Sequence, residues 1–537
     1  MTRTLLRGGY VHTPSDPHAT ALCIEDGQIV WTGDDDASAH FADNADRIIE
    51  LEDRLVTPTF VDAHVHLAQT GFAAAGIDLT VATSLQDALG MLASHPDAGA
   101  PVVFGHGWDD TAWPEQRPFT REEVDRAANG RPAFLSRVDE HSAVVSTAFL
   151  DTCPEVAGAD GFDASGRVER QAHHVAREGL FRLMTPAARE GAILRALRDA
   201  ARQGIGMVHE LGAPHISPPG DFDIIGDLAA AALREGDALP EVERYWGSLD
   251  ADDALRFGCS GAAGDLCMDG SIGSRTAAMH APYADADTTG HLYLSREEVR
   301  DHVVCCTRAG LQAGFHAIGD RATSELVAGF AMAAESLGAP ALVRARHRVE
   351  HLEMVSWPDM RTLGELGVTA SVQPVFDELW GGTESLYAQR LGSDRATPMN
   401  PYASLNRAGV ALAFGSDTPV TSFGPWAAVR AAAHHHTLSE RLTVRAAFNA
   451  HTRGGWRAAR RDEGGVIAVG APASIAVWDV PGELVVQTPD PRVAAWSTDP
   501  RAGVPHLPDL RPDNDLPSCV MTVVAGNIAY EEPGVLR

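Results

Sequence analysis

The stretch FVDAHVHL, residues 60–67, decides the fold class that this sequence predicts. It is an apolar run of strand length that carries His64 and His66, and residues i and i+2 of a strand point to the same side about 6.7 Å apart. Two imidazoles at that spacing can bind one metal ion. Ligands at the carboxyl end of a strand are typical of an α/β barrel, because all its parallel strands open onto one functional face.

Three later segments each bring another potential ligand to the end of a short apolar run. They are GFHAIGDRA (314–322) with His316, RVEHLEM (348–354) with His351, and ALAFGSDTPV (411–420) with Asp417. A chain with 23 histidines in 537 residues holds roughly one H-x-H pair by chance, so the first pair alone says little. Because the other candidates also stand at strand ends, the sequence predicts that they converge on one metal site.

The middle of the chain alternates candidate strands with Ala- and Arg-rich helical stretches such as residues 187–204, which indicates parallel strands joined by helices. The gap after the first candidate strand exceeds a hundred residues and predicts an inserted cap subdomain at about 68–195. Eight runs fit the strands of a closed (β/α)8 TIM-like barrel spanning 58–464: 59–66, 205–210, 241–247, 264–268, 313–318, 346–351, 369–374 and 411–416.

Both ends of the chain consist of short β runs separated by turns. In ATALCIEDGQIVWTGD (19–34) an Asp-Gly pair between alternating apolar residues indicates a hairpin with a type I′ turn. Residues 470–487 and 518–532 show similar short runs. We therefore expect residues 1–57 and 465–537 to form one β-sandwich domain beside the barrel.

The composition narrows the possible partners and location. The chain has 73 acidic and 43 basic residues, and a formal charge of -30 opposes binding to nucleic acid or to an anionic membrane surface. No stretch approaches the ~18 apolar residues of a membrane span, and the seven cysteines form no C-x-x-C pair. We expect a cytoplasmic protein that acts on a small molecule, with a homodimer as the commonest oligomer.

Longer motifs carry a resemblance to a known family. They are FVDAHVHL, GWDDTAW (107–113), RVDEHSAVVSTAFL (137–150), MDGSIGSRTAAM (268–279), GFHAIGDRA, RVEHLEM, SVQPVF (371–376), AFGSDTPV and residues 449–479. On these motifs the chain resembles the amidohydrolase superfamily, and within it the large-insert amidohydrolase family 3 branch, over nearly its whole length. The resemblance implies a (β/α)8 barrel with a β-sandwich from both termini, and hydrolysis of C–N bonds, usually amides.

The resemblance also implies a metal centre, with one departure. Many relatives carry on the fourth barrel strand a lysine that CO₂ carboxylates to bridge two metals, whereas this chain has Asp265 there and no lysine anywhere. An aspartate carboxylate lies several ångströms closer to its own backbone, so we expect it to bridge the same sites only if other parts shift. Cys267 would share its side, as a soft reserve ligand or as core filler. The matching metal-site positions are His64, His66, His316, His351 and Asp417.

The expected cofactor is one divalent ion, most simply zinc, held by His64, His66, His316 and Asp417. Fe or Mn would also suit these ligands. His351 would contact a weak second ion or the substrate oxyanion. Asp417 would take the proton of a metal-activated water and return it to the leaving nitrogen.

We expect substrate contacts from residues in the insert signatures and in the loops that follow barrel strands. For each of these residues, a purely structural role is about as strongly expected as a substrate contact. Arg275 is the preferred anchor, because a guanidinium fork suits a carboxylate or amide oxygen. The other candidates are Trp108, Asp109, His141, Asp320, Arg321 and Gln373.

Three functions stay open at this point. The first is hydrolysis of a non-peptide amide, as by a deformylase or deacylase of N-substituted amides. The second is deamination of a heterocyclic amine with the same kind of ion, which release of ammonia would reveal. The third is a metal-binding scaffold without catalysis, which the missing lysine favours and the retained Asp417 opposes.

Overall fold

An eight-stranded parallel sheet forms the centre of the computed structural model, which describes residues 2–96, 101–485 and 505–536. Backbone bonds between the two edge strands nearly close the sheet into a TIM-like barrel: Asp417 N donates to His64 O at 2.8 Å, and His66 N donates to Thr418 O at 3.1 Å. The strands, in spatial order, are β7 (Phe60–Val65), β13 (Ile205–Gly212), β14 (Glu241–Trp246), β15 (Gly261–Ala262), β16 (Gln312–Ala317), β17 (Arg348–His351), β18 (Thr369–Val372) and β19 (Ala411–Phe414).

The fourth strand differs from the prediction. Every other predicted run overlaps an observed strand, but β15 covers only Gly261–Ala262, so the strand predicted at 264–268 was wrong. Gly264 has a φ of +96°, a conformation that glycine tolerates and that takes the chain out of the extended strand. The chain then pairs again with β16, because Met268 N donates to His316 O at 2.8 Å.

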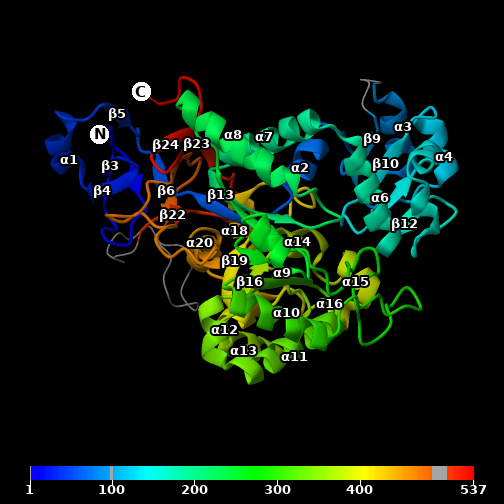
Figure 1. Cartoon of the computed structure of the whole chain (residues 1–537). Helices are drawn as coiled ribbons and strands as arrows, with labels where there is room; N and C mark the ends of the chain where they lie inside the picture. Colours follow the sequence, from blue (N-terminus) through cyan, green and yellow to red (C-terminus); the bar gives the residue numbers. More distant parts are fainter. Residues whose placement is uncertain (1, 97–100, 486–504, 537) are drawn as a thin grey trace.

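Helices cover the outside of the barrel, as α10 (Arg296–Ala309) and α11 (Asp320–Leu337) show in Figure 1. Helix α7 (Pro186–Arg202) illustrates why they form. Pro186 occupies its first turn, and the Thr185 side chain accepts from Ala188 N at 3.2 Å. Its buried residues recur at helical spacing: Ala192, Ile193, Ala196, Leu197, Ala200 and Ala201. Four of them, Ile193, Ala196, Leu197 and Ala200, pack into the main hydrophobic core.

A separate five-stranded sheet lies in the chain between β7 and β13, and Figure 1 shows this part beside the barrel. It includes β9 (Val103–Trp108) and β10 (Ala133–Arg137), which run parallel. Helix α6 (Arg170–Leu183) leads from this part back toward the barrel. The exact boundary of 68–195 for the cap, like the other domain limits, stays a prediction.

The two ends of the chain meet in one sheet. Strand β6 (Leu55–Pro58) pairs antiparallel with β20 (Ile475–Asp479), which pairs with β23 (Ser518–Val524). Figure 1 places both termini on this side of the molecule. The sandwich arrangement stays a prediction, and the part of the predicted 465–537 segment from 486 to 504 lies outside the described residues.

The N-terminal hairpin follows its sequence signal. Strands β3 (Ala21–Glu25) and β4 (Gln28–Gly33) pair antiparallel around Asp26 and Gly27. Both turn residues have positive φ, 46° and 81°, as a type I′ turn requires.

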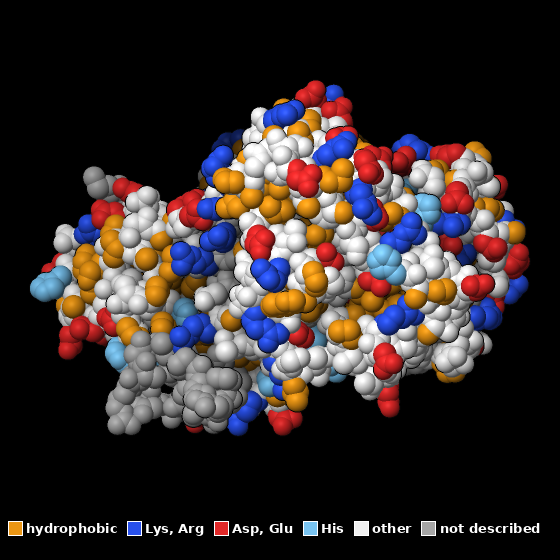
Figure 2. Space-filling view, turned by 90° about the horizontal axis from the view of Figure 1, so that it is seen from below, with side chains coloured by type: hydrophobic (Ala, Val, Ile, Leu, Met, Phe, Trp, Pro, Cys, Tyr) orange, Lys and Arg blue, Asp and Glu red, His pale blue; other side chains and the backbone are white. Residues whose placement is uncertain are grey.

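Acidic and arginine side chains are interspersed over the face shown in Figure 2. Among the described residues, no single helix has the length and apolarity needed to cross a membrane. Helices α11 and α12 (Ala339–Ala345) reach that length and apolarity only when they are taken together, and the chain bends by 115° between them.

Candidate metal centre

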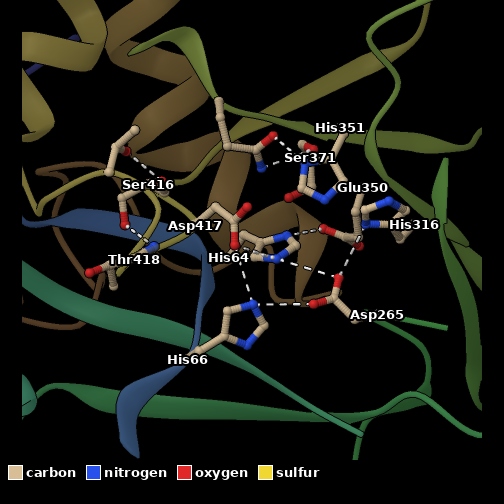
Figure 3. Close-up of polar contacts among 12 residues, drawn as sticks. His64, His66, Asp265, His316, Glu350, His351, Ser371, Ser416, Asp417 and Thr418 are labelled. Atoms are coloured by element: carbon tan, nitrogen blue, oxygen red, sulfur yellow. Dashed lines mark hydrogen bonds and ion pairs between the residues drawn. The ribbon is translucent and has the colours of Figure 1, made fainter. Parts of the chain in front are cut away.

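His64 lies on strand β7 and His66 follows the strand directly, so both stand at its carboxyl end (Figure 3). Both side chains are buried, and their ring centroids lie 5.2 Å apart. Asp62, on the same side of the strand, is used by the backbone: its Oδ1 accepts from Ser416 N at 2.9 Å and from His64 N at 3.3 Å. Asp62 thereby fixes the loop after β19 against the two histidines.

That loop delivers Asp417, which has a left-handed φ of 56°. Its Oδ1 lies 3.2 Å from Nε2 of both His64 and His66. Burial would raise the pKa of Asp417, but the charges and hydrogen bonds of the two imidazoles outweigh it and hold the pKa well below its ordinary value. The buried carboxylate is therefore charged.

Asp265 lies between the β7 histidines and His316 (Figure 3). Its Oδ2 is 3.2 Å from His66 Nε2, and its Oδ1 is 3.6 Å from His64 Nε2 and 3.8 Å from His316 Nδ1. The turn at Gly264 carries the backbone of Asp265 away from a regular strand. The Asp265 side chain is shorter than a carboxylated lysine, and this displacement of the main chain brings its carboxylate to the centre.

His316 and His351 form the other side of the centre, with ring centroids 4.4 Å apart. His316 Nε2 donates to Gly270 O at 3.3 Å, which leaves Nδ1 toward Asp265. His351 Nδ1 donates to Gln373 Oε1 at 2.9 Å, which leaves a lone pair on Nε2.

A buried ion pair behind the centre orients His64. Glu350 Oε2 accepts from His64 Nδ1 at 3.1 Å, and the same carboxylate accepts from Arg348 Nε at 2.5 Å. Glu350 and Arg348 are fully buried on β17. A carboxylate that holds the outer nitrogen of an imidazole is the usual support of a metal ligand, because it fixes the tautomer and aims Nε2 inward.

The donor set fits a divalent cation. The described residues contain two groups of potential ligand atoms that lie within 4.8 Å of one another: His64, His66 and Asp417, and His64, Asp265 and His351. Nε2 of His64 and Oδ1 of Asp265 are buried without a hydrogen bond to any described residue. These two buried atoms face each other at 3.6 Å without a hydrogen bond, and a cation between them would satisfy both.

The pKa values of the imidazoles support the same interpretation. Burial lowers the pKa of His64 and His66, but Asp265 and Asp417 more than offset it. The pKa of His64 lies well above its ordinary value, and that of His66 is raised to about 9. Without a metal the site therefore binds protons in its place, as metal sites do.

Of the predicted substrate contacts, His141 lies at the centre, and Gln373 contacts one of its histidines. The His141 ring lies 5.1 Å from that of His316, and both residues line the cavity in front of the metal cluster. Gln373 acts one step back, through His351.

The insert residues Trp108 and Asp109 do not line this cavity. Trp108 is buried in the cap core, where its Nε1 donates to Leu135 O at 2.9 Å. Asp109 pairs with Arg137 at 2.8 Å. Both serve the internal structure of the cap.

The loop residues are also engaged elsewhere. Arg275 forms a bidentate pair with Asp285, at 3.0 and 2.6 Å, so its guanidinium is already occupied. Asp320 accepts from His280 N at 2.9 Å at the start of α11, and Arg321 is exposed. None of these three side chains lies in the position expected for a substrate contact.

Sequence reasoning missed the network that joins the cap to the barrel. Arg137 pairs with Asp139 at 2.9 Å, and the Asp139 carboxylate accepts from the hydroxyls of Ser271 and Ser274 at 2.7 and 2.9 Å. Asp139 also accepts from the backbone N of His141 at 3.3 Å. The signal was present as RVDEHS and DGSIGS, but only the fold shows that these segments meet.

Comparisons with known proteins agree with this architecture. A metal-dependent hydrolase of Pyrococcus horikoshii is similar in structure, with a TM-score of 0.70 and 24% identity over 92% of this chain and 99% of that one. In sequence, the putative amidohydrolase YtcJ of Bacillus subtilis is 24% identical over 84% of this chain and 89% of its own length. The N-substituted formamide deformylase of Arthrobacter pascens is 22% identical, with 86% and 90% covered.

The sequence profile of the amidohydrolase family matches residues 47–530, from the β-strands before the barrel to those after it. This match spans most of the chain and includes every residue of the metal centre. The chain therefore belongs to the amidohydrolase family.

Proposed function

We propose that this protein cleaves the C–N bond of a small non-peptide amide with a metal-activated water. The observation that supports this most is the buried Asp417 carboxylate, whose Oδ1 lies 3.2 Å from Nε2 of both His64 and His66. Such a cluster of imidazoles and a carboxylate favours zinc, and it leaves a charged oxygen beside the reaction site.

We place one tightly held divalent ion, most simply zinc, among His64, His66 and Asp417, with Asp265 as the fourth donor. This differs from the set expected from the sequence, in which His316 was the fourth ligand. His316 and His351 lie across Asp265 and would hold a second, weaker ion. A divalent ion held there supplies acidity to a bound water and polarises the scissile carbonyl.

Asp417 has the position of the general base. It lines the cavities on both sides of the cluster, so its carboxylate reaches the space where a substrate carbonyl would lie. There it would accept the proton from water and pass it to the leaving nitrogen, which must be protonated before the C–N bond breaks.

His351 suits a ligand better than an oxyanion donor. Burial and the nearby His316 lower the pKa of His351 to about 3, so the ring is neutral near pH 7. Its one proton is on Nδ1, in the bond to Gln373. Nε2 then offers a lone pair to a cation and no proton to an oxyanion.

The cavity in front of the cluster supports a substrate with an apolar part. Phe376, Trp380 and Tyr387 line it together with His316 and Asp417. Aromatic side chains contribute large apolar area, so this wall would bind a hydrocarbon or aromatic substituent.

The test is turnover of a panel of N-substituted formamides and N-acyl amines by protein whose metal content has been measured. We expect release of the carboxylic acid and the amine, loss of activity after chelation, and recovery on adding zinc. Ammonia released from heterocyclic amines, without amide cleavage, would replace this proposal by the deaminase. Full metal occupancy without any turnover would favour the inactive scaffold.

A further inference from the structure

A second cavity adjoins the metal cluster on the side of the cap, and we call it the cap-side chamber. Its metal-cluster wall includes His66, Asp265 and His316. Its other wall includes Arg177 from α6, His174 from the same helix, and His215 from the loop after β13.

Arg177 differs from every other buried arginine among the described residues. It is only 7% exposed, yet no described residue forms an ion pair or a hydrogen bond with its guanidinium. By contrast, Arg137 pairs with Asp139 at 2.9 Å, and Arg390 pairs with Asp285 at 2.7 Å. Burying an unpaired charge is costly. A buried guanidinium that faces a cavity and has no partner therefore indicates that an anion binds there.

An acidic side chain of the chamber does not remove this charge. Glu140 lines the chamber, but among the described residues no ion pair joins it to Arg177. Burial raises the pKa of Glu140, and Arg177 acts against that rise. The guanidinium thus keeps free hydrogen-bond donors toward the chamber.

The histidines beside Arg177 are suited to an anion and not to a second metal. The rings of His174 and His215 stack at 4.0 Å, and neither belongs to a metal-ligating group among the described residues. Burial, with smaller contributions from Arg177, lowers the pKa of His174 to about 2 and that of His215 to about 3. Neutral imidazoles can each donate one N–H to an anion.

We infer that Arg177 binds a carboxylate of the substrate in the cap-side chamber, with His174 and His215 as neutral neighbours. A planar guanidinium fork matches a carboxylate through two parallel hydrogen bonds. This inference rests on the proposed function and narrows its substrate class. The substrate is a small amide with a carboxylate on one side of the scissile bond and an apolar group on the other, where Phe376 and Trp380 lie.

Binding is the first test, and it needs no turnover. 3-Phenylpropionate and 3-phenylpropionamide have nearly the same shape and differ in charge. Titration calorimetry on zinc-loaded and on metal-free protein should show the carboxylate binding at least about tenfold more tightly than the amide. Arg177→Gln should abolish this difference, whereas Arg275→Gln, whose arginine is paired with Asp285, should keep it.

If Arg177→Gln fails to fold, the comparison of the two ligands on the unmodified protein and on Arg177→Lys decides. Lysine keeps the charge and loses the fork, so a reduced preference is expected. Equal affinity for both ligands on folded, unmodified protein would overturn the inference.

Kinetics separate this inference from the proposed function. We expect N-phenylacetylglycine, with its phenyl group on the acyl side and its carboxylate on the amine side, to have a lower KM than N-ethyl-2-phenylacetamide, and Arg177→Gln to raise the KM of the first alone. Hydrolysis of both amides with equal KM, unaffected by Arg177→Gln, would overturn the carboxylate site and leave the hydrolase intact. Hydrolysis of neither, with Arg177-dependent binding of 3-phenylpropionate, would overturn the hydrolase and keep the site.

Discussion

Two pairs of histidines lie at or beside the cap-side chamber, and their charged neighbours shift their pKa values in opposite directions. His64 and His66 stand beside Asp265 and Asp417, which raise the pKa of both rings. His174 and His215 stand beside Arg177, and burial with that charge lowers the pKa of both rings. The same residue type therefore contributes to a cation site at the barrel strands and to an anion site where the cap meets the barrel, and the charges next to it decide which.

The largest effect should come from the carboxylate that serves both as ligand and as base. Asp417→Asn keeps an oxygen near His64 and His66 but cannot accept a proton, so kcat should fall by about 10²- to 10⁴-fold while much of the metal stays bound. Steady-state kinetics with metal analysis checks this. Asp320→Asn makes the same change beyond the cavity and should leave kcat near its original value; unchanged turnover in Asp417→Asn would refute the base role.

The position of the missing lysine gives the next effect. Asp265→Ala removes the carboxylate that faces His64, His66 and His316, so metal affinity should fall by more than the roughly 10- to 100-fold known for losing an outer-sphere partner. Competition with a chelator measures it. Cys267→Ala, in the same segment and the same chamber, is the matched control. Equal metal affinity in the two variants would show that Asp265 is not a ligand.

The buried support of His64 should matter less for the metal and more for stability. Glu350→Gln leaves the Arg348 cation without its counter-charge, so metal affinity should fall by about 10- to 100-fold and unfolding should become easier by roughly 3–5 kcal/mol. Chelator competition and chemical denaturation give the two values. Adding Arg348→Met should restore much of the stability but not the metal affinity. Recovery of both together would contradict a separate role of Glu350 toward His64.

The smallest effect concerns acid stability on the cap side. In the folded protein the pKa of His174 is about 2, below its ordinary value of 6.5. Between these two pH values the unfolded chain therefore binds a proton on His174 that the folded chain does not bind. Stability is therefore lost as the pH falls from about 6.5 toward 2. His174→Gln should reduce that loss by up to about 1.4 kcal/mol per pH unit between pH 6 and 4.

Denaturation of metal-free protein at several pH values measures this slope. The same substitution at the exposed His18 is the control for residue type. A slope that His174→Gln leaves unchanged would mean that the cap-side ring is protonated like an exposed one, and the contrast between the two groups of histidines would fail.

Much of the barrel could be predicted because its signals are local. Apolar runs such as FVDAHV and ALAF form strands wherever they pair, and the Asp-Gly turn at residues 26–27 requires no distant partner. The placement of Asp417 beside His64 and His66 follows from the common direction of barrel strands. The order of the barrel strands, and the order of the metal-site residues at their ends, could therefore be predicted from the sequence.

The remainder depends on long-range geometry. Asp265 reaches the centre because one glycine takes a positive φ, and nothing in GDLCMDGS indicates which glycine does so. Arg275 and Arg177 look alike as sequence, yet Asp285 occupies the first and no described residue occupies the second. Which arginine stays unpaired is decided by how the cap docks on the barrel, which one sequence does not reveal.

The sheet shared by both chain ends has a consequence for biosynthesis. Strand β6 leaves the ribosome about 400 residues before its partner β20, which at roughly 5 to 20 residues per second is a delay of about 20 to 80 s. During this time the edge of β6 that carries Leu55 and Val56, both buried in the folded protein, lacks its neighbouring strand β20. A nascent chain of this protein therefore exposes one unpaired edge of β6 through most of its synthesis, and we expect this edge to favour non-native strand pairing until β20 has been made.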